Sequence, residues 1–346
     1  MPTDVLGSAI RRLASGESLS SEETALAFDV IMRGEATPAR IAAVLMALRV
    51  KGETAEEVAG GAQAMRNAMV HLPARDPDGL VDTCGTGGGA LQTFNISTAA
   101  ALVAAGAGVR VAKHGNRSFT SRSGSADVLE ALGVAVEVPV EVMRRTLERT
   151  GIVFMFAPLM HPAMRHVGPV RRELAIGTLL NVLGPLANPA GAGRQVVGVS
   201  EVGRLPLLAG ALASLGSHHA MVVYGEPGMD EVSPLGCTLV HEVRSGAVTE
   251  WTIDPANLGM EASSEAELAG GSPEDNARTI LEVLSGERHG GARSAVLLNA
   301  AAAIYVGGKA PSYEEGLAVA VRALDEGRGM VALNALRREE QDSQHA

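Results

Sequence analysis

Cysteine and aromatic residues are scarce in this sequence of 346 residues. Two cysteines, Cys84 and Cys237, are too few for a disulfide framework or a zinc cluster. Aromatic residues make up only 3%, which disfavours stacking of nucleic-acid bases. Positive charge is also in deficit, because 29 basic residues face 39 acidic ones and the formal net charge is −10. Nonspecific nucleic-acid binding needs a basic surface, so we expect no nucleic-acid partner.

Long hydrophobic runs are missing as well. The most apolar stretch, residues 99–109, is short and is interrupted by two glycines, so we expect it not to span a membrane. The first residues lack a basic segment followed by an apolar run, so no secretory signal is expected. These features predict a cytoplasmic protein without a membrane partner.

Hydrophobic residues, in contrast, make up 46% of the chain, enough for one large core or two smaller ones. The charged fraction of 20% excludes general disorder. Glycine occurs 41 times without a collagen-like period, which is too often for a plain helical bundle. This glycine content suits an α/β protein with many tight turns.

The segment before residue 72 carries the start signals of successive helices. Residues 20–23 begin one helix, and Thr37 with Pro38 supplies the N-cap and first-turn proline of the next. Thr54 and Glu57 have the spacing of a capping box. We interpret this segment as a helical packing unit, with a dimer interface as its added role.

A polar, proline-rich connection at residues 72–79 separates this unit from a different pattern. Beyond it, short β-branched runs at 80–83, 109–112, 195–199 and 220–224 alternate with helical segments near 97–105 and 125–132. The alternation predicts an α/β fold with a mainly parallel central sheet flanked by helices. Ligands of such sheets bind beyond the carboxyl ends of the strands.

A glycine-rich loop, residues 85–90, follows the first expected strand. Its glycines would let backbone amides approach an anion, although a plain tight turn remains an alternative. The spacing also fits a dinucleotide-binding motif, but Lys113 stands where that motif needs an acidic residue. Nearby, Asn95, Ser97 and Thr98 lie where a helix begins. One of them suffices as an N-cap, and the others suit a magnesium ion or a phosphate.

Three further segments carry polar chemistry. Residues 113–125 combine lysine, histidine and two arginines with four serines, which favours an anion site. Asp230 and Glu231, adjacent in a loop after a strand, suit magnesium, which joins one or two carboxylates to substrate phosphates. An arginine within 161–174 could pair with a substrate carboxylate. Together these segments predict a magnesium-dependent enzyme acting on a phosphorylated, or pyrophosphorylated, small molecule.

Taken in order, the motifs resemble the anthranilate phosphoribosyltransferase family over nearly the whole chain. The resemblance is carried by residues 85–88, 95–98, 113–118, 123–133, 161–165, 169–174, 183–189 and 230–231. It implies a smaller all-helical domain formed by residues 1–72 plus about 166–190, which makes a homodimer. Residues 73–165 and 191–346 would form the large α/β domain.

The resemblance also implies a reaction and its residues. The enzyme would transfer the phosphoribosyl group of 5-phosphoribosyl 1-pyrophosphate (PRPP) to anthranilate, with Mg²⁺, in tryptophan biosynthesis. The residues implied to hold PRPP are Gly85, Gly88, Gly89, Thr93, Asn95, Ile96, Ser97, Thr98, Lys113, His114, Gly115, Asn116, Arg117, Ser118, Phe119, Thr120, Ser121 and Ser125. Those implied to bind Mg²⁺ are Ser97, Asp230 and Glu231, and those implied to contact anthranilate are Asn116, Arg171 and the Gly85 backbone. Lys113, Asn116 and Arg171 are the implied catalytic residues, and His114 is an additional candidate for assisting proton removal.

Two departures from the family pattern matter for the site. Gly89 stands where the family usually has aspartate, so we expect altered magnesium dependence. Gly177 stands where an arginine is usual, within Glu-Leu-Gly-x-Arg-Thr. A pyrimidine or thymidine nucleoside phosphorylase, which would not need magnesium, is one alternative. A catalytically weak paralogue that binds a ligand or nucleic acid is the other.

Overall fold

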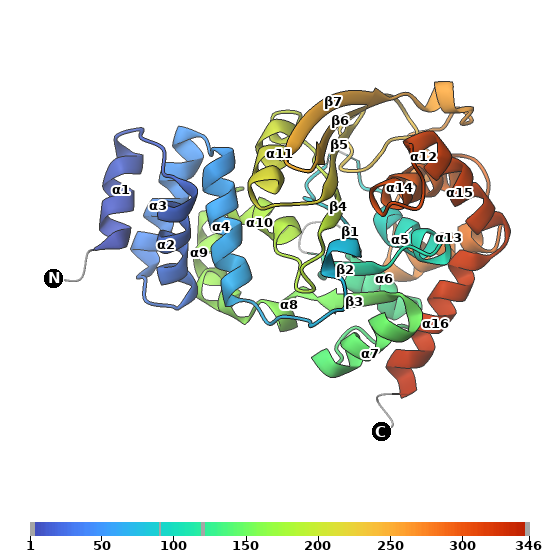
Figure 1. Ribbon diagram of the computed structural model, residues 1–346, viewed down its shortest axis with the longest axis horizontal. Coiled ribbons are helices and arrows are strands. Elements are labelled where there is room, and N and C mark those ends of the chain that lie inside the picture. The colour runs from blue at the N-terminus through green and yellow to red at the C-terminus, as the bar shows by residue number, and fades with distance from the viewer. Residues whose placement is uncertain (1–3, 90, 119–121, 343–346) are drawn as a thin grey trace.

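One seven-stranded sheet, in the order β3-β2-β1-β4-β5-β6-β7, forms the centre of the molecule (Figure 1). The computed structural model describes residues 4–89, 91–118 and 122–342. The strands are β1 (Val81–Gly85), β2 (Val111–Gly115), β3 (Ile152–Phe156), β4 (Arg194–Gly198), β5 (His219–Gly225), β6 (Thr238–Arg244) and β7 (Ala247–Ile253). The first five strands in this order, β3-β2-β1-β4-β5, are parallel to one another. Strands β6 and β7 add an antiparallel hairpin next to β5. The predicted α/β class with a mainly parallel sheet is confirmed.

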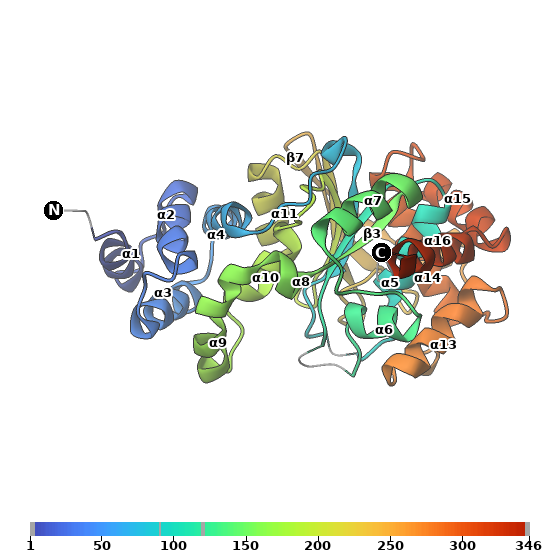
Figure 2. The ribbon, with the colours of Figure 1, turned by 90° about the horizontal axis from the view of Figure 1, so that it is seen from below.

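Helices cover both faces of this sheet because side chains alternate between the faces along each strand. Val196 and Val223 belong to the core shared with α5 (Ile96–Gly106) and α14 (Gly291–Val306). Their neighbours Val197 and Val222 point to the other face and share a core with α11 (Arg204–Ser214). The five parallel strands β1 to β5 are therefore largely buried, with helices on both sides (Figure 2), whereas β7 is largely exposed.

The remaining elements of the large unit surround this frame. They are the 3₁₀ turns at Pro77–Gly79, Pro162–His166 and Pro255–Leu258 and the helices α6 (Ser125–Ala131), α7 (Val140–Thr150), α8 (Ala157–Met160), α12 (Glu265–Leu268), α13 (Pro273–Leu284), α15 (Tyr313–Asp325) and α16 (Arg328–Asp342). Throughout the described ranges, each helix is too short or too polar to cross a bilayer.

A group of helices lies at the opposite end of the molecule from α16 (Figure 1). It consists of α1 (Val5–Ala14), α2 (Ser21–Met32), α3 (Pro38–Lys51), α4 (Ala55–Ala68), α9 (Gly168–Leu174) and α10 (Leu180–Leu186). The expected helix starts are present, since Ser20 and Thr54 form capping boxes and Thr37 caps α3. Helix α4 also packs against α11, so this group adjoins the sheet-bearing part.

Glu57 is the polar centre of the helical group. Its side chain is fully buried, and its carboxylate accepts hydrogen bonds from the amides of Leu19 (3.0 Å) and Thr54 (2.9 Å). The Lys51 ammonium lies 2.9 Å away and supplies the compensating charge. One carboxylate thereby ties together the starts of α2 and α4 and the end of α3.

We expect Glu57→Gln to lower the free energy of unfolding by about 3 kcal/mol, because Lys51 would lose its buried partner. Urea unfolding followed by circular dichroism measures this loss. Exposed Glu56, its neighbour in sequence, provides the control as Glu56→Gln. A loss below about 1 kcal/mol, the value of an exposed ion pair, would contradict the central role of Glu57.

One strand prediction needs correction, and some strands were missed. The second strand, expected at 109–112, runs from Val111 to Gly115, so Lys113 and His114 lie on a strand rather than in a loop. The cause is pairing with β3, in which Lys113 lies opposite Phe154 and His114 opposite Met155. Neither β3 nor the β6–β7 hairpin was anticipated from the sequence.

Candidate active site

A pocket of ≈350 Å³ lies at the carboxyl ends of β1, β2 and β5. The glycine loop forms one wall, the start of α5 and the end of β2 form another, and the loop after β5 closes it. Fourteen of the implied site residues line it: Gly85, Gly88, Gly89, Thr93, Asn95, Ser97, Thr98, Lys113, His114, Gly115, Asn116, Ser125, Asp230 and Glu231. Segments more than a hundred residues apart thus meet in one place.

Several other implied residues are not among those lining the pocket. Ile96 is 1% exposed and belongs to the hydrophobic core. Ser118 and Arg171 are also absent from the lining, and Arg171 lies on α9 in the helical group. The implied contacts of Phe119, Thr120 and Ser121 fall outside the described residues.

Arg117 is directed away from the role implied for it. Its guanidinium contacts three carboxylates, those of Asp127 (3.3 Å), Glu130 and Glu137 (3.1 Å). It also lies over the ring of Phe156, 5.4 Å from the centroid. Several acidic groups therefore already neutralise this cation, and it anchors the loop to α6 instead of facing the pocket.

Of the three candidate N-caps, Asn95 takes the N-cap position of α5. Asn95 precedes α5, but its side chain makes no cap hydrogen bond. Its Nδ2 donates to the Ser123 carbonyl (3.1 Å), and its Oδ1 accepts from Asn276 (2.9 Å). The amide of Ser97 donates instead to Glu231, at 3.2 Å. The helix start is therefore capped from another loop, and Asn95 connects three segments around the pocket.

Asp230 lies directly over the ends of β1 and β4. A Cβ at Gly85 would approach Asp230 Oδ2 to 2.1 Å, and one at Gly198 would approach its carbonyl oxygen to 1.6 Å. Both strands therefore have to end in glycine. The carboxylate accepts a hydrogen bond from the Gly87 amide (2.8 Å), which links the acidic loop to the glycine loop.

The two acidic side chains are half-buried in the pocket wall without enough positive charge around them. Burial raises the pKa of Asp230 above its ordinary value. Burial, together with the negative charge of Asp230, raises the pKa of Glu231 to about 8. A divalent cation would supply the missing charge.

The donor set fits magnesium. Asp230, Glu231 and the Ser97 hydroxyl offer hard oxygen ligands at one wall of the pocket. The described residues contain no cluster of three or more His, Cys, Asp or Glu side chains arranged for a metal. Magnesium does not need such a cage, because it retains waters and binds substrate phosphates.

Lys113 lies at the base of the pocket with only 4% of its surface exposed. Its Nζ donates to the Thr83 carbonyl at the end of β1 (2.6 Å) and to Ser97 Oγ at the start of α5 (3.3 Å). Burial lowers the pKa of Lys113, while the nearby Asp82 carboxylate opposes this shift. The ammonium is thus placed where an anion in the pocket would meet it.

His114 is poorly suited to act as a base that becomes charged. Burial, with repulsion from His161, lowers the pKa of His114 to about 3. The two rings lie 4.8 Å apart between centroids, and burial lowers the pKa of His161 to about 4. Both imidazoles therefore remain neutral near pH 7.

These two histidines predict acid sensitivity of the fold. Their pKa values are lower in the folded than in the unfolded state, so the unfolded chain binds more protons below about pH 6.5. Stability should therefore fall as the pH falls, with a loss of about 2 kcal/mol per histidine at pH 5. Urea unfolding at pH 7 and pH 5 measures it. His161→Leu should reduce the stability difference between pH 7 and pH 5 by about 2 kcal/mol. The exposed control His289→Gln should leave this difference unchanged. An unchanged difference in His161→Leu contradicts the argument.

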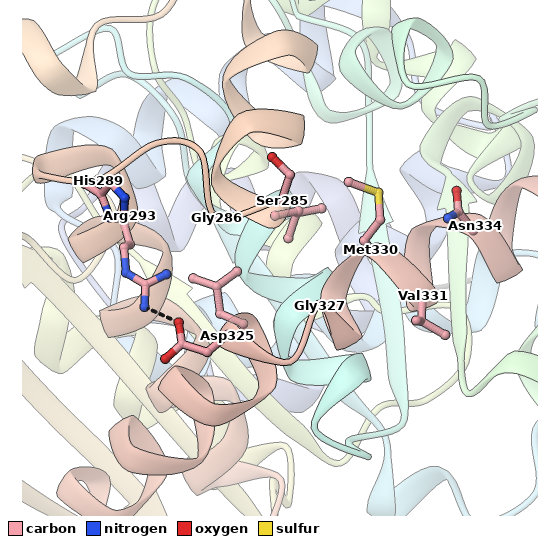
Figure 3. A pocket seen from close by; sticks show the side chains of 11 residues that line it. Ser285, Gly286, His289, Arg293, Asp325, Gly327, Met330, Val331 and Asn334 are labelled. Atoms are coloured by element: carbon pink, nitrogen blue, oxygen red, sulfur yellow. Dashed lines mark hydrogen bonds and ion pairs between the residues drawn. The ribbon is translucent and has the colours of Figure 1, made fainter.

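A second pocket, of ≈440 Å³, lies among the end of α13, the start of α14, and α15 and α16 (Figure 3). Its most buried cation, Arg293, is paired with Asp325 at 2.7 Å. None of the strand ends contributes to its lining. The strand-end pocket is therefore the stronger candidate for chemistry.

The departure at residue 177 is local. Gly177 is exposed, and a Cβ there would meet nothing within 4 Å, so the described structure has room for a side chain. Two residues earlier, Ala175 ends α9 with φ +51° and ψ 26°, a left-handed conformation that favours glycine. The family pattern has glycine at this position, which agrees with the backbone.

The helical group and the α/β part, with a pocket at its strand ends, are the two parts of a glycosyl transferase. Residues 7–69 match the helical bundle domain of the glycosyl transferase family, and residues 77–330 match its a/b domain. Among curated proteins, the chain is 53% identical to the anthranilate phosphoribosyltransferase of Rubrobacter xylanophilus, over 95% of this chain and 96% of that one. It is 52% identical to the enzyme of Anaeromyxobacter dehalogenans, with the same coverage. The chain belongs to the anthranilate phosphoribosyltransferase family.

Solved structures agree with this assignment. The crystal structure of anthranilate phosphoribosyltransferase from Thermus thermophilus superposes with a TM-score of 0.91 at 44% identity, covering 96% of this chain and 99% of that one. The Saccharomyces cerevisiae enzyme in complex with PRPP and Mg superposes with a TM-score of 0.88 at 29% identity, covering 98% and 99%. The family resemblance seen in the sequence is thereby confirmed.

Proposed function

We propose that this protein transfers the phosphoribosyl group of PRPP to the amine of anthranilate, giving N-(5-phosphoribosyl)anthranilate and pyrophosphate, in tryptophan biosynthesis. The observation that carries the proposal is the strand-end pocket, which gathers a glycine loop, a buried lysine and two half-buried carboxylates. Relatives about half identical over nearly their whole length are named for this activity.

In the proposed reaction, the anthranilate nitrogen forms a bond to C1 of the ribose. The bond between C1 and the pyrophosphate oxygen breaks, its electron pair leaves with pyrophosphate, and the nitrogen loses a proton. Lys113 stabilises the negative charge that develops on the leaving group, and the glycine-loop amides orient the phosphates. Mg²⁺, held by Asp230, Glu231 and Ser97, supplies further charge neutralisation. Because an aromatic amine is neutral at pH 7, positioning matters more than a strong base.

We assign the acceptor to Asn116, Arg171 and the Gly85 backbone. Asn116 and Gly85 line the pocket, while Arg171 projects from α9 on the helical side. Burial lowers the pKa of the Arg171 guanidinium, so the group gains from a carboxylate partner such as that of anthranilate. PRPP would occupy the glycine loop and the 113–125 segment.

We further propose that residues 1–72 and about 166–190 form one domain and that residues 73–165 and 191–346 form the other. Packing of α2 on α4, α1 on α3, α10 on α4 and α9 on α3 supports the helical domain, and α11 of the other part extends the same core. Homodimerisation through the helical domain is supported by the exposed Leu26 on α2 and Val50 on α3, which are 49% and 80% exposed. A reducing compartment such as the cytoplasm suits the two unpaired cysteines.

The test follows anthranilate fluorescence after addition of PRPP, with and without Mg²⁺. A loss that needs both PRPP and Mg²⁺ is expected. No loss, with PRPP binding intact by calorimetry, would exclude anthranilate as the acceptor. Magnesium-independent phosphorolysis of a nucleoside would favour the nucleoside phosphorylase alternative, and failure to bind PRPP would favour the weak paralogue.

Gly89 offers a direct test of the magnesium argument. A Cβ at this position would lie 3.1 Å from the Gly228 carbonyl oxygen and 3.5 Å from Asp230 Oδ1. Gly89→Asp therefore adds a carboxylate beside Asp230, and we expect a shift of about threefold or more in the Mg²⁺ concentration for half-maximal activity. Gly89→Asn is the uncharged control of nearly the same shape. An unchanged magnesium profile and PRPP affinity in Gly89→Asp contradict the expectation.

A further inference from the structure

The β1–β2 contact is unlike its neighbours in the sheet. Strands β1 and β4 pair at five positions, and so do β2 and β3, but β1 and β2 pair only at Val81 and Val111. Beyond that pair the two strands proceed toward the pocket without a backbone ladder. These are the strands that carry the glycine loop and Lys113.

Side chains take the place of the missing ladder. Asp82, fully buried on β1, accepts a hydrogen bond from the His114 amide of β2 through Oδ1, at 3.1 Å. In the opposite direction, Lys113 on β2 donates to the Thr83 carbonyl of β1. The position of the Lys113 ammonium therefore depends on the distance between the strands.

Asn188 completes the bridge from a third segment. Its Nδ2 donates to Asp82 Oδ2 (2.7 Å) and to the Ala112 carbonyl of β2 (2.8 Å). Its Oδ1 accepts from the Ala190 amide at 2.9 Å, which fixes the amide orientation. Asn188 is 3% exposed and lies between α10 and β4, in the motif 183–189 that has no role in the reaction described above.

We propose that Asp82 and Asn188 are positioning residues that set the separation of β1 and β2, and thereby place Lys113 relative to the glycine loop. The inference rests on the proposed function, since Lys113 and that loop are the groups being placed. Reactive groups need to be held within about 0.5 Å, and a misplacement of about 1 Å can cost on the order of 10²-fold in rate. The pair also connects the segment after α10 to both strand ends.

Asp82→Asn tests the pair while keeping the shape of the side chain. Its new amide group would face the donor group of Asn188, so one of the two bridging contacts has to open. We expect a decrease in kcat of about tenfold or more per folded molecule, a smaller change in KM for anthranilate, and faster hydrogen exchange of the His114 amide. Adding Asn188→Asp to Asp82→Asn restores the donor–acceptor pair between residues 82 and 188 but turns a carboxylate oxygen toward the Ala112 carbonyl, so kcat should recover only in part.

Glu57→Gln is the matched control, because it perturbs a buried carboxylate of the helical group. It should lose stability and keep kcat per folded molecule. If Asp82→Asn folds and retains kcat within about twofold, the positioning role is overturned; if it does not fold, Asn188→Ala is judged by the same criterion. If the wild-type protein itself has no transferase activity, the proposed function fails. The positioning role is then tested by PRPP affinity and by hydrogen exchange of the His114 amide. If Asp82 has this role, both should change in Asp82→Asn.

Discussion

Replacing Lys113 by methionine is expected to lower kcat by about 10³-fold, the loss typical of removing a group that stabilises charge developing in the transition state. Methionine keeps an apolar stem of similar length and removes the only ammonium that lines the described pocket. The KM for anthranilate should change much less. Steady-state kinetics at saturating Mg²⁺, with PRPP affinity from calorimetry, separates these effects.

Two variants make the Lys113 result interpretable. Lys113→Gln retains a donor for the Thr83 carbonyl and tests whether charge or anchoring matters. Lys309→Met removes an exposed lysine and should leave kcat unchanged. A decrease of less than about tenfold in Lys113→Met would show that the leaving group is stabilised elsewhere.

The paired replacement of Asp230 by asparagine and Glu231 by glutamine should change activity and stability in opposite directions. Activity should fall by about 10²-fold or more, because the two proposed magnesium ligands are lost. The metal-free protein should become more stable, because burial raises the pKa of both carboxyl groups and their ionised forms oppose folding.

Calorimetric titration with Mg²⁺ in the presence of PRPP, and thermal unfolding without metal, measure the two effects. Glu250→Gln, on the exposed surface of β7, is the control and should change neither. If the double variant keeps its magnesium affinity, the ion is held by other groups. If its metal-free form is less stable, the carboxylates have a structural role.

The sequence predicted the site best where a short motif lies directly after a strand or at a helix start. Residues 85–89 and 230–231 each follow a strand, and parallel strands place their ends at one edge, so the meeting of Gly87 and Asp230 could be foreseen. Capping boxes, which involve residues three apart, were equally readable. The composition of residues 113–125 indicated an anion site but could not tell which cations face it.

What escaped prediction depends on partners far apart in the chain. Arg117 was expected to bind phosphate along with its neighbours in the 113–121 segment, but it is neutralised by carboxylates of α6 and beyond. Asp82 looked like one more polar residue before the glycine loop, and its partner Asn188 lies 106 positions away. The β6–β7 hairpin was missed because its outer strand is largely exposed and has a weak hydrophobic signal.

The crossing of the acidic loop over β1 and β4 limits how this enzyme could diversify. Gly85 and Gly198 have no space for any side chain, so even alanine there would displace the Asp230 backbone or carboxylate. Gly89 is different, because an added Cβ would lie 3.1 Å from the Gly228 carbonyl oxygen, a close contact that a small shift can relieve. We therefore expect evolution or design to alter the metal requirement through residue 89. The two strand ends should remain glycine.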